Sequence, residues 1–346
     1  MIENKPKLKV ALLMNKAMYE RILHPDDLIF LKSFADIVNV KPCPDALDEN
    51  FMKEAIQGAD VCITSWGTPK LTKEVLDMAP ELKMIAHTAG TPRAIVIDEV
   101  WDRKIRVFTA APVIAIDVAE TVLGAMIFSL KCLWQYNSMV HSGEWSRNKE
   151  VVSKQLDYMK RLNYRLTVGI VSASHVGRNL IRILKPFGVK INLYDPYITD
   201  FQASELGVNR VSIEEIMANS DVVSIHAPNL PETYHMINKD LLALMKTGTL
   251  FMNTARGPIV DQDALIAELK TGRINAYLDV YDKEPLPEDS ELLKLDNVIL
   301  SPHISGGHSI NGRYELGNYI VQQLYSYYTK GILENEVKKD IMKVIA

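Results

Sequence analysis

The sequence has little of what stabilises small secreted or metal-dependent proteins. Only three cysteines occur in 346 residues, and Cys43, Cys62 and Cys132 form no C-x-x-C pair, so we predict neither a disulfide framework nor a zinc cluster. The eight histidines include no H-x-x-x-H or H-E-x-x-H pair, which argues against a metal hydrolase. These absences predict a reducing, cytoplasmic setting and no metal site.

The sequence also lacks a strong excess of charge of one sign and a long apolar run. The 39 basic and 43 acidic side chains give a formal net charge of −4 without a basic block, so nucleic acid is not an expected partner. The most apolar stretch, residues 121–130, is bounded by Glu120 and Lys131. It is about half as long as the roughly 20 residues that cross a bilayer. No signal-peptide pattern opens the chain, and we predict no membrane association.

What the sequence does contain is an alternation of strand-like and helical segments. Apolar side chains make up 47% and charged ones 24% of the chain, as in soluble globular proteins. Short β-branched and aliphatic runs between helical patterns indicate parallel βαβ units. We therefore predict an α/β protein with two open, doubly wound parallel sheets. The first series of strands comprises 9–13, 37–40, 61–64, 84–87 and 106–108, and the second comprises 167–171, 190–194, 222–226, 249–253, 276–279 and 297–300.

Two further helices are predicted outside these βαβ units. Apolar residues at helical spacing run through 118–134, with Asp117 as a possible N-cap and a stop near Gly143, and this pattern predicts a domain-bridging helix. A second pattern, 316–327, follows the last strand. This helix could pack against either domain.

The second series opens on a turn where a dinucleotide fingerprint would stand. Residues 168–178 run from a strand through small residues into a helix, and only the third glycine of a G-x-G-x-x-G motif, Gly177, is present. A plain strand-turn-helix connection is an equal alternative. Asp195 ends the next strand, where a carboxylate binds an adenosine ribose and repels the 2′-phosphate of NADP. An Asp-Pro turn is the alternative for this residue.

Three reactive side chains follow later strands of the same series. Arg256, Glu284 and His303 each come after a predicted strand, so they share the carboxyl edge at which open α/β sheets bind ligands. Each alone has an ordinary explanation: a surface ion pair, a loop carboxylate, or a hydrogen-bonded histidine at a strand end. Three such residues at one edge favour a catalytic site.

With these motifs the chain resembles the NAD-dependent D-isomer-specific 2-hydroxyacid dehydrogenase family, which includes D-3-phosphoglycerate dehydrogenase and the glyoxylate/hydroxypyruvate reductases. The resemblance covers nearly the whole chain. It implies an oxidoreductase that transfers a hydride between NAD(H) and a small 2-oxo or 2-hydroxy acid, and a homodimer built on long helices. The segments that carry it are 88–90, 118–120, 143–145, 168–178, 253–257, 279–285 and 302–307.

The resemblance also implies roles for individual residues. Arg256 would hold the substrate carboxylate and 2-oxo oxygen, His303 would donate the proton, and Glu284 would favour the charged imidazole. Further substrate contacts are expected at Ser65, Thr88, Ala89 and Gly90. Cofactor contacts are expected at Ser174, His175, Val176, Gly177, Asp195, Ala227, Thr254, Ala255, Asp279 and Gly306.

A discontinuous domain arrangement follows from the same resemblance. It implies a flavodoxin-like substrate domain of residues 1–116 and 308–346, into which a Rossmann NAD-binding domain of residues 117–307 is inserted. Closure of the cleft between the domains would exclude water from the hydride transfer. Trp66 and residues 112–114 favour a substrate with a modest, partly apolar side chain.

Two serines depart from the family pattern. Ser172 and Ser174 stand where the family has glycines, and we expect weakened NAD(H) binding. The Cβ and hydroxyl of Ser174 occupy the position at which the backbone would approach the pyrophosphate closely. An alternative of another class is an NAD-sensing, corepressor-like regulatory protein of the same fold with weak or no turnover. The lack of a polar or Pro-rich extension argues against that alternative.

Overall fold

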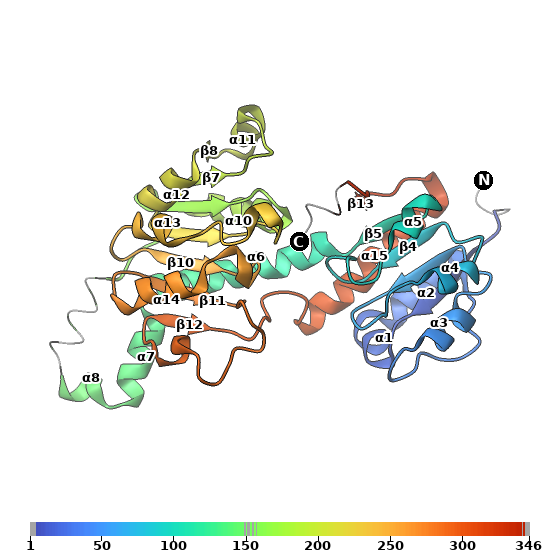
Figure 1. Cartoon of the computed structure of the whole chain (residues 1–346), viewed down its shortest axis with the longest axis horizontal. Helices are drawn as coiled ribbons and strands as arrows, with labels where there is room; N and C mark the ends of the chain where they lie inside the picture. Colours follow the sequence, from blue (N-terminus) through green and yellow to red (C-terminus); the bar gives the residue numbers. More distant parts are fainter. Residues whose placement is uncertain are drawn as a thin grey trace. The chain divides into compact units, whose positions relative to one another are not determined.

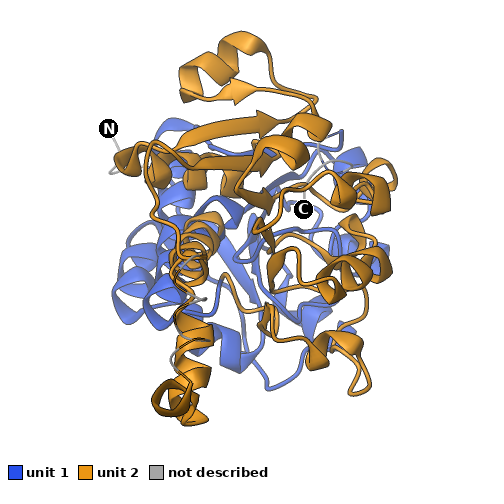
Figure 2. Ribbon diagram, turned by 90° about the vertical axis from the view of Figure 1, so that its left-hand side faces the viewer, with its two compact units in different colours: residues 1–114, 307–345 blue, residues 115–306, 346 orange. Residues whose placement is uncertain are grey.

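The computed structural model describes residues 5–148, 150, 153, 156, 158–340 and 342, and it contains two sheets flanked by helices (Figure 1). The chain divides into two compact units (Figure 2). Unit 1 comprises residues 1–114 and 307–345, and unit 2 comprises residues 115–306. The boundaries expected from the sequence, after residues 116 and 307, fall within two residues of these positions.

Unit 1 is built on a six-stranded sheet of order β13-β5-β4-β3-β1-β2. The pairs among β1 to β5 are parallel and β13 runs antiparallel to β5, so the parallel strands have the flavodoxin-like order 2-1-3-4-5. The strands are β1 (Leu8–Leu13), β2 (Ala35–Ile37), β3 (Val61–Thr64), β4 (Met84–His87), β5 (Arg106–Thr109) and β13 (Glu336–Val337).

Helices cover both faces of this sheet. The helices α1 (Lys16–Ile22), α2 (Pro25–Phe34) and α15 (Ile310–Lys330) share one apolar core with the sheet, and α3 (Glu49–Ala55), α4 (Lys73–Asp77) and α5 (Asp98–Asp102) share the other. Helix α15 approaches α1 so closely that a Cβ on Gly317 would lie 2.0 Å from the Ile22 carbonyl oxygen. The helix predicted after the last strand of the second series therefore packs in unit 1.

Unit 2 is built on seven parallel strands of order β12-β11-β10-β9-β6-β7-β8. This is the Rossmann order with one strand added, and the order reverses between β6 and β9. The strands are β6 (Thr167–Val171), β7 (Lys190–Tyr194), β8 (Asn209–Arg210), β9 (Val222–Ile225), β10 (Leu250–Asn253), β11 (Asn275–Leu278) and β12 (Val298–Leu300).

The strands of unit 2 are nearly continuous apolar runs because both faces of the sheet are covered. Side chains of α12 (Ile213–Asn219), α13 (Lys239–Ala243) and α14 (Gln262–Lys270) share one core with the strands. Helix α10 (His175–Leu184) packs near Ile170 on the other face. Further elements are α6 (Ala111–Leu130), which begins in unit 1 and continues into unit 2, α7 (Leu133–His141), α8 (Glu144–Arg147), α11 (Asp200–Leu206) and the 3-10 turns Lys185–Phe187, Pro231–Thr233, Gly257–Ile259 and Glu291–Lys294.

The prediction of the bridging helix is wrong about where the helix begins and where it ends. Helix α6 begins at Ala111, whose N–H donates to the Thr109 hydroxyl, so Asp117 lies inside the helix and is not its N-cap. The helix ends before Cys132, which has a left-handed φ of 51° and precedes α7. Helix α6 has 20 residues, and its most apolar window has a mean hydropathy of 1.9. By length and composition the helix could span a membrane, but core helices of soluble proteins also meet this criterion. The apolar run is therefore longer than residues 121–130.

The second strand of unit 1 also differs from its prediction. Strand β2 covers Ala35–Ile37 and not residues 37–40, because α2 runs directly into it. The Asn39 side chain then accepts from Leu12 N–H at 2.6 Å and donates to Leu12 C=O at 2.9 Å. These side-chain hydrogen bonds replace backbone pairing with β1 and end the strand.

Candidate active site

Three neighbouring strands of unit 2 deliver the predicted catalytic side chains. Arg256 follows β10, Glu284 follows β11 and His303 follows β12, and these strands pair in parallel in that order. Parallel strands end at the same edge of a sheet, so the three loops emerge together.

Glu284 and His303 form a hydrogen-bonded pair. Glu284 Oε2 lies 2.7 Å from His303 Nδ1, and Glu284 Oε1 accepts from the Tyr281 N–H at 3.1 Å. The imidazole remains 48% exposed and the carboxylate 35% exposed. Because Nδ1 faces the carboxylate, Nε2 is the ring nitrogen available to exchange a proton with a ligand.

Buried Asp279 shapes the loop that carries His303. Its side chain accepts from the N–H groups of Ile304 and Ser305, both at 2.9 Å, and from the Ser301 hydroxyl at 2.5 Å. The His303 N–H donates to the Asp279 carbonyl at 2.9 Å, and His303 takes a left-handed φ of 54°. We expected Asp279 to contact the cofactor, and the hydrogen bonds that its side chain accepts all come from this loop.

The loop of Arg256 is held by a residue that the sequence reasoning did not single out. Asn253 donates through Nδ2 to the Arg256 carbonyl and accepts at Oδ1 from the Ala255 N–H, both at 3.0 Å. A Cβ on Gly257 would lie 1.9 Å from the Tyr281 carbonyl, so only glycine lets this loop contact the loop of Glu284. The Arg256 guanidinium donates to the Ala255 carbonyl at 2.6 Å.

Buried hydroxyl groups without a hydrogen-bond partner mark the carboxyl edges of both sheets. In the described part of unit 2 these include Thr254 Oγ1 and Ser305 Oγ, and in unit 1 Ser65 Oγ. A buried polar group without a partner is costly unless a ligand satisfies it. Thr254 and Ser65 were predicted ligand contacts. Ser305 was not predicted as a ligand contact, although it lies in the segment 302–307 that carries His303.

The turn between β6 and α10 keeps one feature of a dinucleotide site. Helix α10 begins at His175, directly after the strand at which the sheet order reverses, and Val176 lies in its first turn. A Cβ on Gly177 would lie 2.1 Å from the Ser172 carbonyl oxygen, so only glycine allows this approach. The Ser174 hydroxyl accepts from the Gly177 N–H at 3.4 Å and caps the helix. An anion at this N-terminus would be favoured by the free N–H groups and the helix dipole.

The carboxylate predicted to bind the ribose, that of Asp195, is already hydrogen-bonded within the protein. Asp195 is 7% exposed and accepts from the Ala173 N–H at 2.7 Å, from the Tyr197 N–H at 2.8 Å and from the Ser172 hydroxyl at 3.3 Å. Ser172 has a φ of 83°, a conformation that glycine adopts without strain. The residues thus fit a dinucleotide at the helix and at Thr254, and they depart from the usual pattern at Ser172.

The remaining predicted cofactor residues lie at the same edge. Ala227 follows β9 and is buried, and Gly306 follows the histidine loop. Next to Ala227, His226 lies with Nε2 2.9 Å from the Ser224 hydroxyl. Burial lowers the pKa of His226 to about 3, so its imidazole is neutral.

The predicted substrate residues of unit 1 follow two adjacent strands. Ser65 follows β3, and Thr88, Ala89 and Gly90 follow β4. The Thr88 hydroxyl donates to the Thr64 carbonyl at 3.0 Å, which leaves Ser65 as the predicted residue with a buried, unpartnered hydroxyl. The structure therefore brings all four residues to one edge of the sheet of unit 1.

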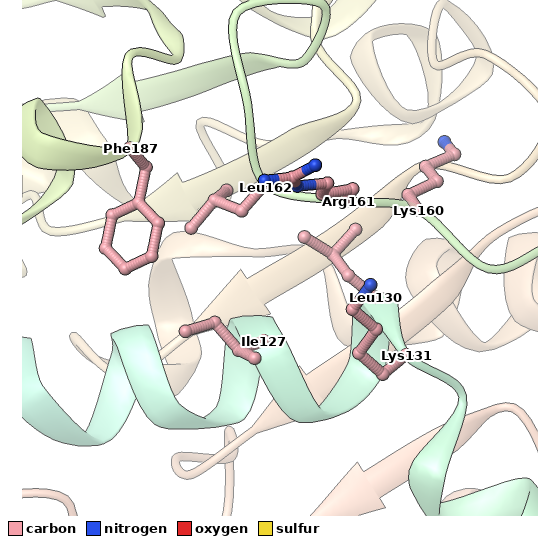
Figure 3. Close-up of a pocket in the computed structure, with 7 residues that line it drawn as sticks. All are labelled: Ile127, Leu130, Lys131, Lys160, Arg161, Leu162 and Phe187. Atoms are coloured by element: carbon pink, nitrogen blue, oxygen red, sulfur yellow. The ribbon is translucent and has the colours of Figure 1, made fainter.

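A small apolar pocket lies elsewhere in unit 2. It has a volume of about 290 Å³ and joins the end of α6 to the segments that precede β6 and β7 (Figure 3). Since those segments enter the amino ends of their strands, the pocket is not at the edge that carries His303. Its lining residues are Ile127, Leu130, Lys131, Lys160, Arg161, Leu162 and Phe187.

The Rossmann order of unit 2 and the histidine–carboxylate pair at its carboxyl edge define the class of a dinucleotide-dependent oxidoreductase. The particular family follows from comparison with known proteins. The model described as "D-isomer specific 2-hydroxyacid dehydrogenase, NAD binding domain" matches residues 123–305. The chain belongs to this family of NAD-dependent oxidoreductases.

Individual relatives agree with this assignment. A glyoxylate reductase of Thermococcus litoralis is 34% identical over 86% of this chain and 89% of its own length. A D-3-phosphoglycerate dehydrogenase of Methanocaldococcus jannaschii is 30% identical over 96% of this chain, and the chain spans 60% of that protein's length. The apo D-mandelate dehydrogenase of Rhodotorula graminis, 24% identical, shares the fold with a TM-score of 0.79 over 96% of this chain and 98% of its own. These relatives lend no support to the regulatory alternative.

Proposed function

We propose that this protein reduces a small 2-oxo acid to the D-2-hydroxy acid, or catalyses the reverse oxidation, with Arg256, His303 and Glu284 as its catalytic residues. The observation that carries the proposal is the 2.7 Å contact between His303 and Glu284 on loops adjacent to that of Arg256. Such a pair couples a proton donor to a carboxylate that stabilises its charged form.

Each catalytic side chain has a separate task. Arg256 holds the substrate carboxylate and 2-oxo oxygen through its planar fork of donors. His303 donates a proton from Nε2 to the carbonyl oxygen during reduction and accepts it during oxidation. Glu284 orients the ring through Nδ1, and the Tyr281 N–H holds Glu284 in turn. In unit 1, Ser65, Thr88, Ala89 and Gly90 supply further contacts to the substrate.

The cofactor is NAD(H), which supplies or accepts the hydride when bound. Ser174, His175, Val176 and Gly177 at the start of α10 hold its diphosphate, and Asp195 faces its adenosine ribose. The unpartnered Thr254 hydroxyl and the neighbouring Ala255 contact the cofactor at the end of β10. Ala227, Asp279 and Gly306 line the rest of its path. Unit 2 is then the NAD-binding domain and unit 1 the substrate domain.

The substrate has a modest, partly apolar side chain. Trp66 is 39% exposed, and a Cβ on Gly307 would lie 3.0 Å from its ring. Ile114 approaches the same glycine and also Gly90. This apolar cluster lies beside the loops of Ser65 and Gly90 in unit 1, and it suits an aliphatic group better than a phosphate.

The protein acts as a homodimer in which the long helices of unit 2 form the interface. Helix α7 has no buried residue, and large apolar side chains stay exposed around it, including Leu133 at 45%, Val140 at 55% and Trp145 at 60%. A helix with no buried residue gains little from its own domain, and such patches are typical of protein interfaces. The proposed setting is the cytoplasm, without nucleic acid or membrane as a partner.

A substrate panel tests the proposed reaction. NADH and NADPH oxidation would be followed with glyoxylate, hydroxypyruvate, phosphohydroxypyruvate and 2-oxo acids bearing aliphatic or aromatic side chains, and the product's configuration determined. We expect NADH-dependent formation of a D-product, with an apolar 2-oxo acid preferred. A strong preference for the phosphorylated acid contradicts the substrate proposal, and L-product formation contradicts the reaction. Sedimentation of the wild type and of Val140→Glu tests the dimer.

A further inference from the structure

The carboxylate of Asp195 has room for few further hydrogen bonds. A carboxylate offers about four acceptor positions, two on each oxygen. Oδ2 accepts from the Ala173 N–H and the Ser172 hydroxyl, and Oδ1 accepts from the Tyr197 N–H. Both acceptor positions on Oδ2 are therefore filled, and one position remains on Oδ1. A ribose diol that donates from both hydroxyls needs two positions.

The backbone of Ser172 is held on two sides. Its N–H donates to the Tyr194 carbonyl at 2.7 Å, which ties it to the end of β7. Its carbonyl oxygen packs so closely against α10 that a Cβ on Gly177 would lie only 2.1 Å from it. With a φ of 83° between these two contacts, Ser172 cannot withdraw its hydroxyl by moving the loop. Only rotation about χ1 releases Asp195.

We propose that the Ser172 hydroxyl takes the place of one ribose hydroxyl on Asp195, so that this protein recognises the adenosine ribose of its cofactor through one hydrogen bond instead of two. Glycine at the same position has no hydroxyl to donate and would leave both positions open. The proposal rests on the proposed NAD(H) cofactor and assigns Ser172 as a residue that determines how tightly and how selectively the dinucleotide is bound. Without the cofactor, the buried carboxylate of Asp195 still accepts three hydrogen bonds from the protein.

The same geometry separates the two serines that depart from the family pattern. Ser174 has an extended conformation, with φ −60°, and its hydroxyl accepts from the Gly177 N–H at the start of α10. The hydrogen bonds to the Asp195 carboxylate come from Ser172, Ala173 and Tyr197 instead. Ser174→Gly therefore changes the diphosphate end of the site and serves as the matched control for Ser172.

Binding of cofactor analogues to the full-length protein tests the proposal. Calorimetry would give the Kd of NAD⁺ and of its 2′-deoxyadenosine and 3′-deoxyadenosine analogues for the wild type, Ser172→Gly, Ser172→Ala and Ser174→Gly. For the wild type, we expect at most one analogue to bind weaker than NAD⁺. We expect Ser172→Gly to bind NAD⁺ about tenfold tighter than the wild type does. Each analogue should bind this variant about tenfold more weakly than NAD⁺ does, which is the effect of one hydrogen bond to a charged acceptor.

Ser172→Ala separates the hydroxyl from the backbone. It removes the hydroxyl and keeps a side chain at the left-handed φ, so it should show the same loss with both analogues as Ser172→Gly, even if its thermal stability is lower. Ser174→Gly should alter the three affinities equally. The proposal is overturned if the wild type already loses affinity with both analogues, or if Ser172→Ala behaves like the wild type. Failure of every variant to bind NAD⁺ would instead contradict the cofactor assignment.

Discussion

Two stretches of one sheet edge in unit 2 follow the family pattern to different degrees. At the ends of β10, β11 and β12, the loops of Arg256, Glu284 and His303 have the expected residues, and their hydrogen bonds hold them in place. At the ends of β6 and β7, Ser172 replaces a glycine and fills an acceptor position of Asp195. We call these the catalytic stretch and the dinucleotide stretch. The difference teaches that the proposed catalytic side chains and the proposed contacts to the cofactor's diphosphate and ribose lie on separate loops, so that one set can change while the other is kept.

The largest expected effect is on the catalytic stretch alone. His303→Asn removes the proton donor, and asparagine tolerates the left-handed φ of 54° at this position. We expect kcat to fall about 10³-fold, with the Kd of NADH changed less than twofold by calorimetry. Turnover within tenfold of the wild type would show that His303 is not the proton donor. A large loss of NADH affinity would show that the two stretches are not independent.

Arg256→Lys should have the next largest effect. Lysine keeps the positive charge but cannot donate two parallel hydrogen bonds to a carboxylate. We expect kcat/KM for the best 2-oxo acid to fall about 10²-fold, again with NADH affinity retained. Arg256→Gln, which also removes the charge, should lose more. Equal activity of Arg256→Lys and the wild type would mean that charge alone recruits the substrate.

Acid should destabilise unit 2 through His226, which follows the strand between the two stretches. Burial lowers the pKa of this imidazole to about 3, whereas an unfolded histidine has a pKa of about 6.5. Between these values the unfolded chain binds more protons, so stability falls as pH decreases below about 6.5. We expect His226 to contribute a loss of about 2 kcal/mol at pH 5.

Thermal or denaturant unfolding between pH 7 and pH 5 would measure this contribution. His226→Asn should be less stable than the wild type at pH 7 and should lose less stability on acidification. Parallel pH profiles of the two proteins would show that the imidazole does not remain neutral in the folded state.

Glu284→Gln should have the smallest effect of the four changes. Glutamine can still hydrogen-bond Nδ1 of His303 but provides no negative charge. We expect kcat to fall about tenfold, with unchanged KM and NADH affinity, and Glu284→Asp to recover part of the loss. If Glu284→Gln weakens NADH binding instead, the carboxylate belongs functionally to the dinucleotide stretch.

The sequence predicted the strands of unit 2 well for a physical reason. Strands buried on both faces are continuous apolar runs with abrupt polar ends, and 167–171 and 190–194 match β6 and β7 in full. The two-residue strands β8 and β13 were missed because such short pairings leave no periodicity. β2 was misplaced because the Asn39 side chain, and not a change in hydropathy, ends it.

The sequence allowed the residues of the candidate site to be predicted, but not the hydrogen bonds that these residues make. Arg256, Glu284 and His303 could be placed on one edge because strand order determines which loops are neighbours. That Asp279 hydrogen-bonds the histidine loop, and that Ser172 reaches Asp195, depends on backbone angles and side-chain rotamers that no spacing in the sequence encodes. The unpartnered hydroxyl of Ser305 depends in the same way on packing.

Helix α15 has a consequence for how the protein is made. It supplies Leu316, Ile320, Val321 and Leu324 to the core of unit 1, yet it leaves the ribosome about 200 residues after β5. At a synthesis rate of roughly 5–20 residues per second, this delay is about 10–40 seconds. During that time unit 2, which is continuous in the chain, can complete its own core, while one face of the nascent sheet of unit 1 is covered only by α1 and α2. The core of unit 1 can therefore be completed only after α15 has been translated.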